Sequence, residues 1–202
     1  MQDFPAGFFD RGDPSPDDRF YAPPRLVTHL DDGAIAAVGD LYASLGLTGR
    51  VLDLMSSWVS HFREPPAQLV ALGMNAAELA ANPAATERIV HDLNADPRIP
   101  LPDADVDAAV CCVSIDYLVR PVEALADVAR VLRPGGTIAI TYSNRCFPTK
   151  AIRGWLALDD AGRGALVAEY LRRAGGYTEP QVELRNPGRR GDPLWSVTAR
   201  RG

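Results

Sequence analysis

Apolar residues recur along the chain at two spacings, and each spacing predicts a different kind of element. Over residues 30–45 they fall every three or four positions, which is typical of an amphipathic helix. Two aspartates stand at the start of this stretch and Gly46 follows it, in keeping with the charge and residue preferences of helix ends. The same spacing predicts helices over 121–132 and 159–174.

Short uninterrupted apolar runs form the second pattern, at 51–54, 69–72, 88–91, 108–113 and 137–142. Continuous runs suit strands that are buried on both faces of a sheet. Because helical stretches separate these runs, the pattern predicts five strand–helix units joined by parallel crossovers. The expected fold class is therefore α/β, with a Rossmann-like, doubly wound and mostly parallel sheet.

Two further runs, at 181–184 and 194–198, follow the last predicted helix. A turn-rich link joins them, so we expect a terminal hairpin that adds an antiparallel strand to the sheet. Residues 1–30 include a segment rich in proline and aspartate and are expected to form an arm or lid. Residues 31–202 are expected to form a single domain.

Composition excludes several classes of protein. The chain of 202 residues is 47% hydrophobic, enough to bury a core, yet no stretch approaches the roughly 18 uncharged apolar residues of a membrane span. A net charge of −5 argues against binding nucleic acid by phosphate neutralisation. The start of the chain lacks a signal-peptide pattern, and the three cysteines form neither a disulfide framework nor a zinc motif. We expect a cytoplasmic protein without a metal. The sequence does not indicate the oligomeric state.

Small or polar side chains follow nearly every predicted strand. Ser56 and Ser57 come after the first, Asn75 after the second, Asp92 after the third and Ser114 after the fourth. In an open parallel sheet, ligands bind beyond the carboxyl ends of the strands, where the winding reverses. The sequence therefore predicts a polar ligand pocket at this edge.

Two segments form a more specific pattern. Residues 129–137 read ARVLRPGGT, and residues 99–107 read IPLPDADVD. With these segments, residues 47–142 resemble the class I S-adenosylmethionine-dependent methyltransferases, in their small-molecule, type 11-like branch. The resemblance implies a tight turn at Pro-Gly-Gly before the fifth strand, S-adenosylmethionine as cofactor and a small-molecule methyl acceptor.

The resemblance also implies where the cofactor binds. Asp53 stands where the family has the acidic residue of its first strand, and Asp92 where it has the acid that contacts adenine. Tyr21 and Arg25 lie in a segment that covers the cofactor in similar proteins. The expected cofactor residues are Tyr21, Arg25, Asp53, Leu54, Met55, Ser56, Ser57, Met74, Asn75, Asp92, Leu93, Asn94, Val113 and Ser114.

The chain departs from the family pattern at two places. The glycines usual in the first loop are replaced by Met55, Ser57 and Val59, although glycine there allows positive φ and a close approach of backbone to ligand. Ser56 and Ser57 are small enough to admit a cofactor and to hydrogen-bond its carboxylate or amine. Asn75 replaces the carboxylate that grips the ribose, which removes a charge-assisted hydrogen bond. Cofactor binding weaker than the family norm, or rearranged, is expected.

Several of these residues also have structural interpretations that stay open. Asp53 is alternatively a cap of a following helix, although its place at the predicted switch point favours the cofactor role. Asn75 is suited to an N-cap, with Glu78 completing a capping box. Asp92 and Asn94 are common turn formers.

Methyl transfer needs an aligned nucleophile, and a general base where the acceptor is protonated. The expected catalytic residues near the pocket mouth are His61, Asp116, Tyr117, Asn144 and Arg145. His61 is alternatively a surface residue on a short helix ended by two prolines.

Two charges follow the fifth strand, Arg145 and Lys150. Either they bind an anionic group of the substrate, or they are solvated charges at the start of a helix. Cys146, beside Arg145, is a candidate for a lowered thiol pKa.

Three functions are compatible with these residues. The favoured one is methyl transfer to a small molecule. The second is a methyltransferase fold without catalysis, acting as a binding or regulatory partner, because of Met55 and Asn75. The third is a module that binds another adenosyl compound.

Overall fold

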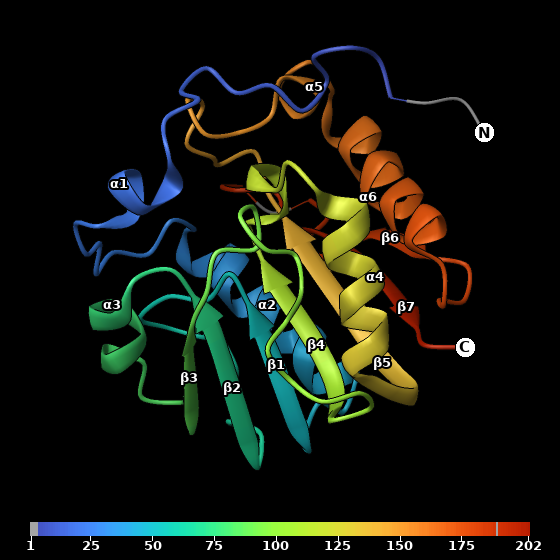
Figure 1. Cartoon of the computed structure of the whole chain (residues 1–202). Helices are drawn as coiled ribbons and strands as arrows, with labels where there is room; N and C mark the ends of the chain where they lie inside the picture. The colour runs from blue at the N-terminus through green and yellow to red at the C-terminus, as the bar shows by residue number, and fades with distance from the viewer. Residues whose placement is uncertain (1–3, 189) are drawn as a thin grey trace.

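A single sheet of seven strands, in the order β3-β2-β1-β4-β5-β7-β6, organises the computed structural model, which describes residues 4–188 and 190–202 (Figure 1). The strands are β1 (Arg50–Leu54), β2 (Gln68–Gly73), β3 (Glu87–Val90), β4 (Val106–Cys112), β5 (Leu132–Tyr142), β6 (Gln181–Leu184) and β7 (Trp195–Arg200). The helices are α1 (Asp17–Tyr21), α2 (Asp32–Ser44), α3 (Ala76–Ala81), α4 (Pro121–Val131), α5 (Arg153–Leu156) and α6 (Asp160–Ala174), with a 3-10 turn at Ile115–Tyr117.

The sheet confirms the predicted fold class. Strands β1 to β5 pair in parallel, whereas β7 is antiparallel to both β5 and β6. The terminal hairpin is therefore present, with β7 inserted between β5 and β6. The winding reverses between β1 and β4, which places the expected ligand region above these two strands.

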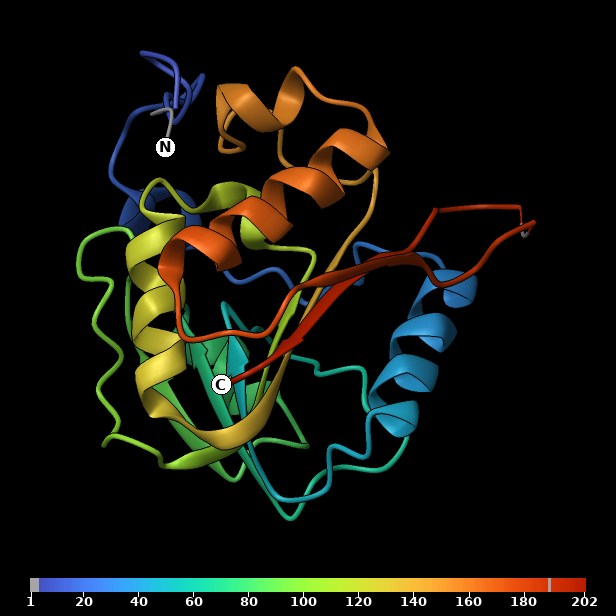
Figure 2. The same ribbon diagram turned by 90° about the vertical axis from the view of Figure 1, so that its right-hand side faces the viewer.

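Helices cover both faces of the sheet, α2 on one side and α4 with α6 on the other (Figure 2). Side chains alternate along each strand, so Val51 packs in the cluster of α2 while Leu52 packs in that of α4 and α6. Burial on both faces explains the continuous apolar runs of β1, β2 and β4. The edge strand β3 is only partly buried, so the expectation of burial on both faces is wrong there. Among the described residues, no helix is long and apolar enough to cross a membrane.

The predicted strand–helix alternation is wrong at two connections. Residues 55–67, between β1 and β2, and residues 91–105, between β3 and β4, contain no helix. The second connection includes Pro97, Pro100 and Pro102, which lack the backbone donors that a helix needs. His61 therefore lies in an irregular loop, and its alternative interpretation as a residue of a short surface helix is also wrong.

The turn predicted at Pro134–Gly136 is instead part of β5. The register between β4 and β5 shifts between Val106 and Ala108, so residues 133–136 bulge from the ladder. Gly135 adopts φ +77°, and its N–H donates to the carbonyl of Arg201 at 3.0 Å. Because the end of the chain pairs with this bulge, the strand assignment extends back to Leu132.

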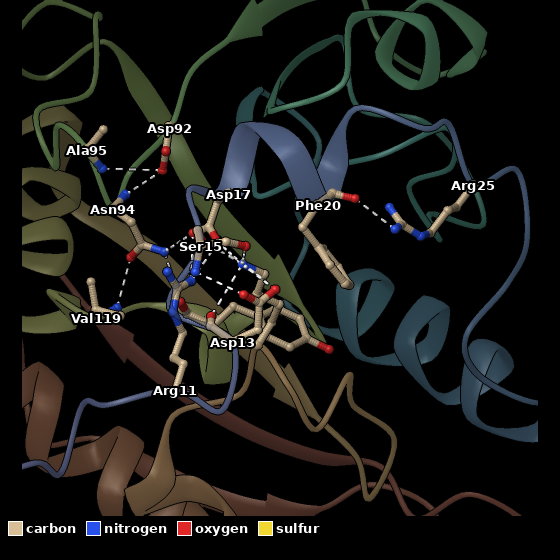
Figure 3. A network of polar contacts seen from close by, with 12 residues as sticks. Arg11, Asp13, Ser15, Asp17, Phe20, Arg25, Asp92, Asn94, Ala95 and Val119 are labelled. Carbon is tan, nitrogen blue, oxygen red and sulfur yellow. Dashed lines mark hydrogen bonds and ion pairs between the residues drawn. The ribbon is translucent and has the colours of Figure 1, made fainter.

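Residues 4–30, called the arm from here on, cross the carboxyl ends of the parallel strands, toward which the arrowheads of β1, β2 and β4 point in Figure 1. The arm is held by a buried charge network (Figure 3). The side chain of Lys150 is 0% exposed, and its Nζ lies 3.1 Å from Oδ2 of Asp13 and 3.2 Å from Oδ1 of Asp17. Arg11 donates to both carboxyl oxygens of Asp17 at 2.7 Å.

Desolvation opposes the ionisation of Asp17, but the hydrogen bonds from Arg11 and Asn94 outweigh it and lower the pKa of this carboxyl. The carboxylate is therefore ionised at neutral pH and pairs with two cations. A buried ion pair that loses one partner leaves an uncompensated charge, which costs free energy. Detachment of the arm would have this cost, so the network holds the arm in place.

We predict that Asp17→Asn destabilises the protein by about 3 kcal/mol, because it leaves Lys150 and Arg11 without their shared buried carboxylate. Urea denaturation gives the free energy of unfolding, and amide hydrogen exchange over residues 4–30 reports detachment of the arm. Asp18→Asn, on the same helix but exposed, is the matched control and should leave both measurements unchanged. Equal effects of the two variants would contradict the role of the network.

Candidate functional site

A cavity of about 470 Å³ opens at the carboxyl ends of β1, β2 and β4, beneath the arm. Its volume lies within the roughly 300–1,000 Å³ of small-molecule sites. Segments of the arm, the loops after β1, β2 and β4, and residues 144–147 after β5 form its wall. The cavity therefore lies at the switch point that the strand order defines.

The predicted site residues come together around this cavity. All the expected cofactor residues line it: Tyr21, Arg25, Asp53, Leu54, Met55, Ser56, Ser57, Met74, Asn75, Asp92, Leu93, Asn94, Val113 and Ser114. Four of the expected catalytic residues also line it, namely His61, Tyr117, Asn144 and Arg145. Asp116 does not line the cavity; it is 3% exposed and faces the interior.

The first loop takes the glycine conformation without a glycine. Met55 has φ +54°, in the left-handed region that non-glycine residues adopt at a cost. The next residue, Ser56, donates its N–H to the carbonyl of Leu72 at 2.7 Å and so turns toward the end of β2. There, a side chain on Gly73 would collide with the carbonyl oxygen of Ser56. Gly73 therefore allows the first loop to pack closely against the end of β2.

Asp53, at the end of β1, is buried beside this loop. Its Oδ2 accepts hydrogen bonds from Ser56 at 2.7 Å and Ser60 at 2.5 Å. Desolvation raises the pKa of Asp53 to about 6, although these two hydroxyls act in the opposite direction. Since residues 55–67, which connect β1 to β2, contain no helix, the interpretation of Asp53 as a helix cap is wrong.

Asn75 serves the fold with its whole side chain. Its carbonyl accepts from the backbone of Ala77 and Glu78 at 3.0 Å, which confirms the predicted N-cap of α3. Its amide donates to the carbonyls of Tyr21 and Ala22 in the arm. The capping box is not formed, because the carboxylate of Glu78 accepts instead from the Ser57 hydroxyl and the Arg25 backbone, both at 2.6 Å.

The segment after β3 is a turn that also fastens the arm. Oδ1 of Asp92 accepts from the backbone of Asn94 and Ala95, so the turn-forming interpretation of Asp92 is confirmed. Asn94 donates to Asp17 at 2.9 Å and accepts from the Val119 backbone at 2.8 Å (Figure 3). Asn75 and Asn94 therefore both join the cavity wall to the arm.

A strained residue ends β4 at the cavity wall. Val113 has φ +45°, an outlier for a β-branched side chain. Such strain, of order 1–3 kcal/mol, concentrates at functional sites. Val113 and Met55 stand at the ends of neighbouring strands and both line the cavity, so the strain is focused at the switch point.

Two of the expected catalytic residues on the cavity wall have shifted pKa values. Burial lowers the pKa of His61, so its imidazole is neutral at pH 7. The Tyr117 hydroxyl accepts from the Phe147 backbone at 2.8 Å. Burial and the neighbouring Asp116 raise the pKa of Tyr117, which keeps the phenol protonated.

Two expectations for the segment after β5 are wrong. Lys150 is buried against the arm and does not face a substrate group in the cavity. Burial and the nearby Asp116 raise the pKa of the Cys146 thiol, whereas a neighbouring arginine was expected to lower it. Cys146 is therefore a neutral thiol on the cavity wall.

Sequence reasoning missed several residues of the cavity wall. The arm contributes His29, the first loop contributes Trp58, α3 contributes Glu78, and Phe147 comes from the segment after β5. Neither periodicity nor the family motif marks these positions. One usable signal was present, because Phe147 lies two residues beyond Arg145 in a segment already expected at the site.

The donor and acceptor set of the cavity fits a cationic adenosyl cofactor. Asp53 and Asp92 each engage the protein through one carboxyl oxygen, so in the described structure their second oxygens remain for ammonium, hydroxyl or amine donors. The Tyr21 hydroxyl is buried, with no partner among the described residues. A buried hydroxyl is costly to leave unpaired, so it favours a bound ligand. Arg25 supplies a cation suited to a carboxylate.

Comparison with known sequences gives the same family. The profile of the methyltransferase domain matches residues 46–140. Relatives named uncharacterized methyltransferases in Mycobacterium tuberculosis and Mycobacterium bovis are 32% identical over 141 residues, which is 69% of this chain and 51% of theirs. The chain thus spans about half the length of the curated relatives it matches.

Solved structures share the fold. The cyclase SpnF superposes with a TM-score of 0.62 at 18% identity, covering 89% of each chain. A SAM-dependent methyltransferase from Aquifex aeolicus gives 0.61 at 18% identity, covering 85% of this chain and 95% of that one. Likeness at this identity shows the architecture alone, and one of these neighbours is named a cyclase, so the fold does not fix the reaction.

We predict that Asp116→Asn weakens the dependence of stability on pH. Desolvation raises the folded pKa of Asp116 to about 8, against 3.8 as its ordinary value. Between these values the folded state holds a proton that the unfolded state has lost, so stability falls as pH rises toward 8, by up to about 1.4 kcal/mol per unit. Urea denaturation at pH 6.5 and pH 8 measures the difference.

This pH window avoids Asp53, whose pKa of about 6 lies below it. Asp18→Asn is the exposed control and should keep the wild-type dependence on pH. If Asp116→Asn and wild type lose the same free energy of unfolding between the two pH values, the buried carboxyl is ionised throughout and the assignment is wrong.

Proposed function

The chain belongs to the class I S-adenosylmethionine-dependent methyltransferase superfamily, and on that premise we propose that it transfers a methyl group from S-adenosylmethionine to a small-molecule acceptor by in-line displacement. One observation carries the proposal. Every residue that the resemblance assigns to the cofactor lines a single cavity at the switch point of the sheet. S-adenosylmethionine is the cofactor of this superfamily.

The residues that would hold the cofactor follow from the free polar atoms of the wall. Asp53 and Asp92 offer one carboxyl oxygen each, and Tyr21 offers its unpaired hydroxyl. Leu93 and Val113 supply apolar contacts for a flat base. Asn75 takes no side-chain part, because its amide and carbonyl already bind the arm and α3.

When bound, the cofactor supplies a methyl group that its sulfonium makes electrophilic. The protein then has to align the acceptor and exclude water, a proximity effect worth up to roughly 7–11 kcal/mol. The arm performs the exclusion, held across the cavity through Asn75 and Asn94. Where the methyl acceptor carries a proton, neutral His61 removes it as a general base. The protonated phenol of Tyr117 donates a hydrogen bond to the methyl acceptor.

A second candidate function is a binding or regulatory role without catalysis. It is favoured by the way the first loop uses its polar groups, since Ser56 donates to Asp53 and Ser57 donates to Glu78. These hydroxyls were expected to bind the carboxylate or amine of the cofactor. The two functions differ in a measurable quantity, which is the affinity for S-adenosylhomocysteine.

We predict that calorimetric titration with S-adenosylhomocysteine gives saturable binding, and that Asp53→Ala weakens it about tenfold or more, the roughly 1.5–3 kcal/mol of a charged hydrogen bond. Asp53→Asn keeps a hydrogen-bond acceptor without the charge and should lie between wild type and Asp53→Ala. Asp40→Ala, on the exposed surface of α2, is the control variant.

The melting temperature of each variant shows that it folds. Absence of heat and of any thermal shift at millimolar ligand in the wild type would defeat methyl transfer and favour the non-catalytic role. An unchanged affinity in folded Asp53→Ala would remove Asp53 from the cofactor site.

A further inference from the structure

Two arginines line the cavity, and they differ in how they are held. Arg25 donates to the carbonyls of Phe20 at 2.8 Å and Pro23 at 3.4 Å, and its Cζ lies 4.5 Å from the centre of the Phe20 ring. The side chain of Arg145 is 61% exposed, and its Nε lies 3.8 Å from Asp192, beyond hydrogen-bond length. In the described part of the chain, Arg145 has no closer charged partner.

The ring of Phe147 brings other groups to the same part of the wall. The His29 ring lies 5.1 Å from it, at 80° between planes, and the Cζ of Arg25 lies 5.6 Å from it. The Phe147 backbone donates to the Tyr117 hydroxyl, which fixes the segment that begins with Arg145. Arg145 precedes Phe147 by two residues, and both line the cavity together with His29.

Burial keeps the imidazole of His29 neutral, and two nearby cations act in the same direction. Desolvation lowers the pKa of His29, and Glu78 opposes this effect. Arg25 and Arg145 lower the pKa further. A neutral imidazole donates one hydrogen bond and accepts another without a charge of its own.

We propose that Arg145, with His29 and the ring of Phe147, forms an anion-binding subsite, and that the methyl acceptor carries a carboxylate or phosphate held there. The assignment of this anion to the acceptor rests on the proposed function. S-adenosylmethionine carries one carboxylate, which Arg25 is suited to bind, whereas the wall presents two cations. The guanidinium of Arg145 therefore remains to bind a second anion, which the methyl acceptor would carry.

The chemistry of the subsite narrows the acceptor further. A guanidinium binds the paired oxygens of a carboxylate or phosphate in a fork. The flat ring of Phe147, on the same cavity wall as Arg145, favours a planar or aromatic body in the acceptor. The acceptor class is thus a small aromatic or unsaturated acid.

Calorimetric titration with benzoate, phenyl phosphate and benzamide tests the subsite, with and without saturating S-adenosylhomocysteine. We expect at least one of the two anions to bind the saturated protein about tenfold or more tightly than benzamide, their neutral analogue. The anion that binds better identifies carboxylate or phosphate as the acceptor group.

The variant Arg145→Gln should weaken binding of that anion about tenfold. Arg153→Gln is the matched control, because Arg153 is 71% exposed, forms an ion pair of the same 3.8 Å length with Asp10, and does not line the cavity. It should leave anion binding unchanged. Melting temperatures of both variants show that they fold.

Three results would overturn the subsite: benzamide binding as tightly as the anions, equal effects of Arg145→Gln and Arg153→Gln, or loss of anion binding once S-adenosylhomocysteine is bound. The last result would assign Arg145 to the cofactor's own carboxylate. Failure of the proposed function is separate, since protein that binds benzoate through Arg145 but gives no heat with S-adenosylhomocysteine keeps the subsite and loses methyl transfer.

Discussion

The reversal of winding between β1 and β4 is the constraint on which the site depends. Chains leaving these two neighbouring strands turn to opposite sides, so a gap opens between them at the carboxyl edge of the sheet. Met55 and Val113 end these strands in left-handed conformations that cost free energy. The apolar layers on both faces of the sheet stabilise the strands enough to tolerate that strain.

The arm covers this gap and is held there by polar side chains of the kind that also bind ligands. Asn75 and Asn94 hold the backbone and side chains of the arm, and Glu78 holds the backbone of Arg25. Polar residues at strand ends therefore divide into two groups. Those with all their donors and acceptors occupied build the enclosure, and those with a free oxygen, such as Asp53 and Asp92, remain for a ligand.

Sequence alone was sufficient for the elements that periodicity controls. The helix α2, the buried strands and the terminal hairpin all follow from apolar spacing, because burial on one or two faces dictates that spacing. It was insufficient for the connections at 55–67 and 91–105, whose proline-rich or polar residues make local contacts without a period. The family motif predicted a set of cofactor residues that line one cavity. It could not reveal which of these side chains are already hydrogen-bonded to the arm. That distinction depends on contacts such as the one between Asn94 and Asp17, which are 77 positions apart.

The long reach of the Lys150 contacts has a consequence for biosynthesis. The Lys150 ammonium binds the carbonyl of Ser15 at 2.8 Å, across 135 positions of sequence. The ribosome makes the arm before the sheet, yet the buried charge network of the arm is incomplete until Lys150 has left the exit tunnel. At roughly 5–20 residues per second, the 135 positions between Ser15 and Lys150 take about 7–27 seconds to synthesise, and the carboxylates of the arm wait for this ammonium throughout. Completion of the charge network is thus a late step of maturation.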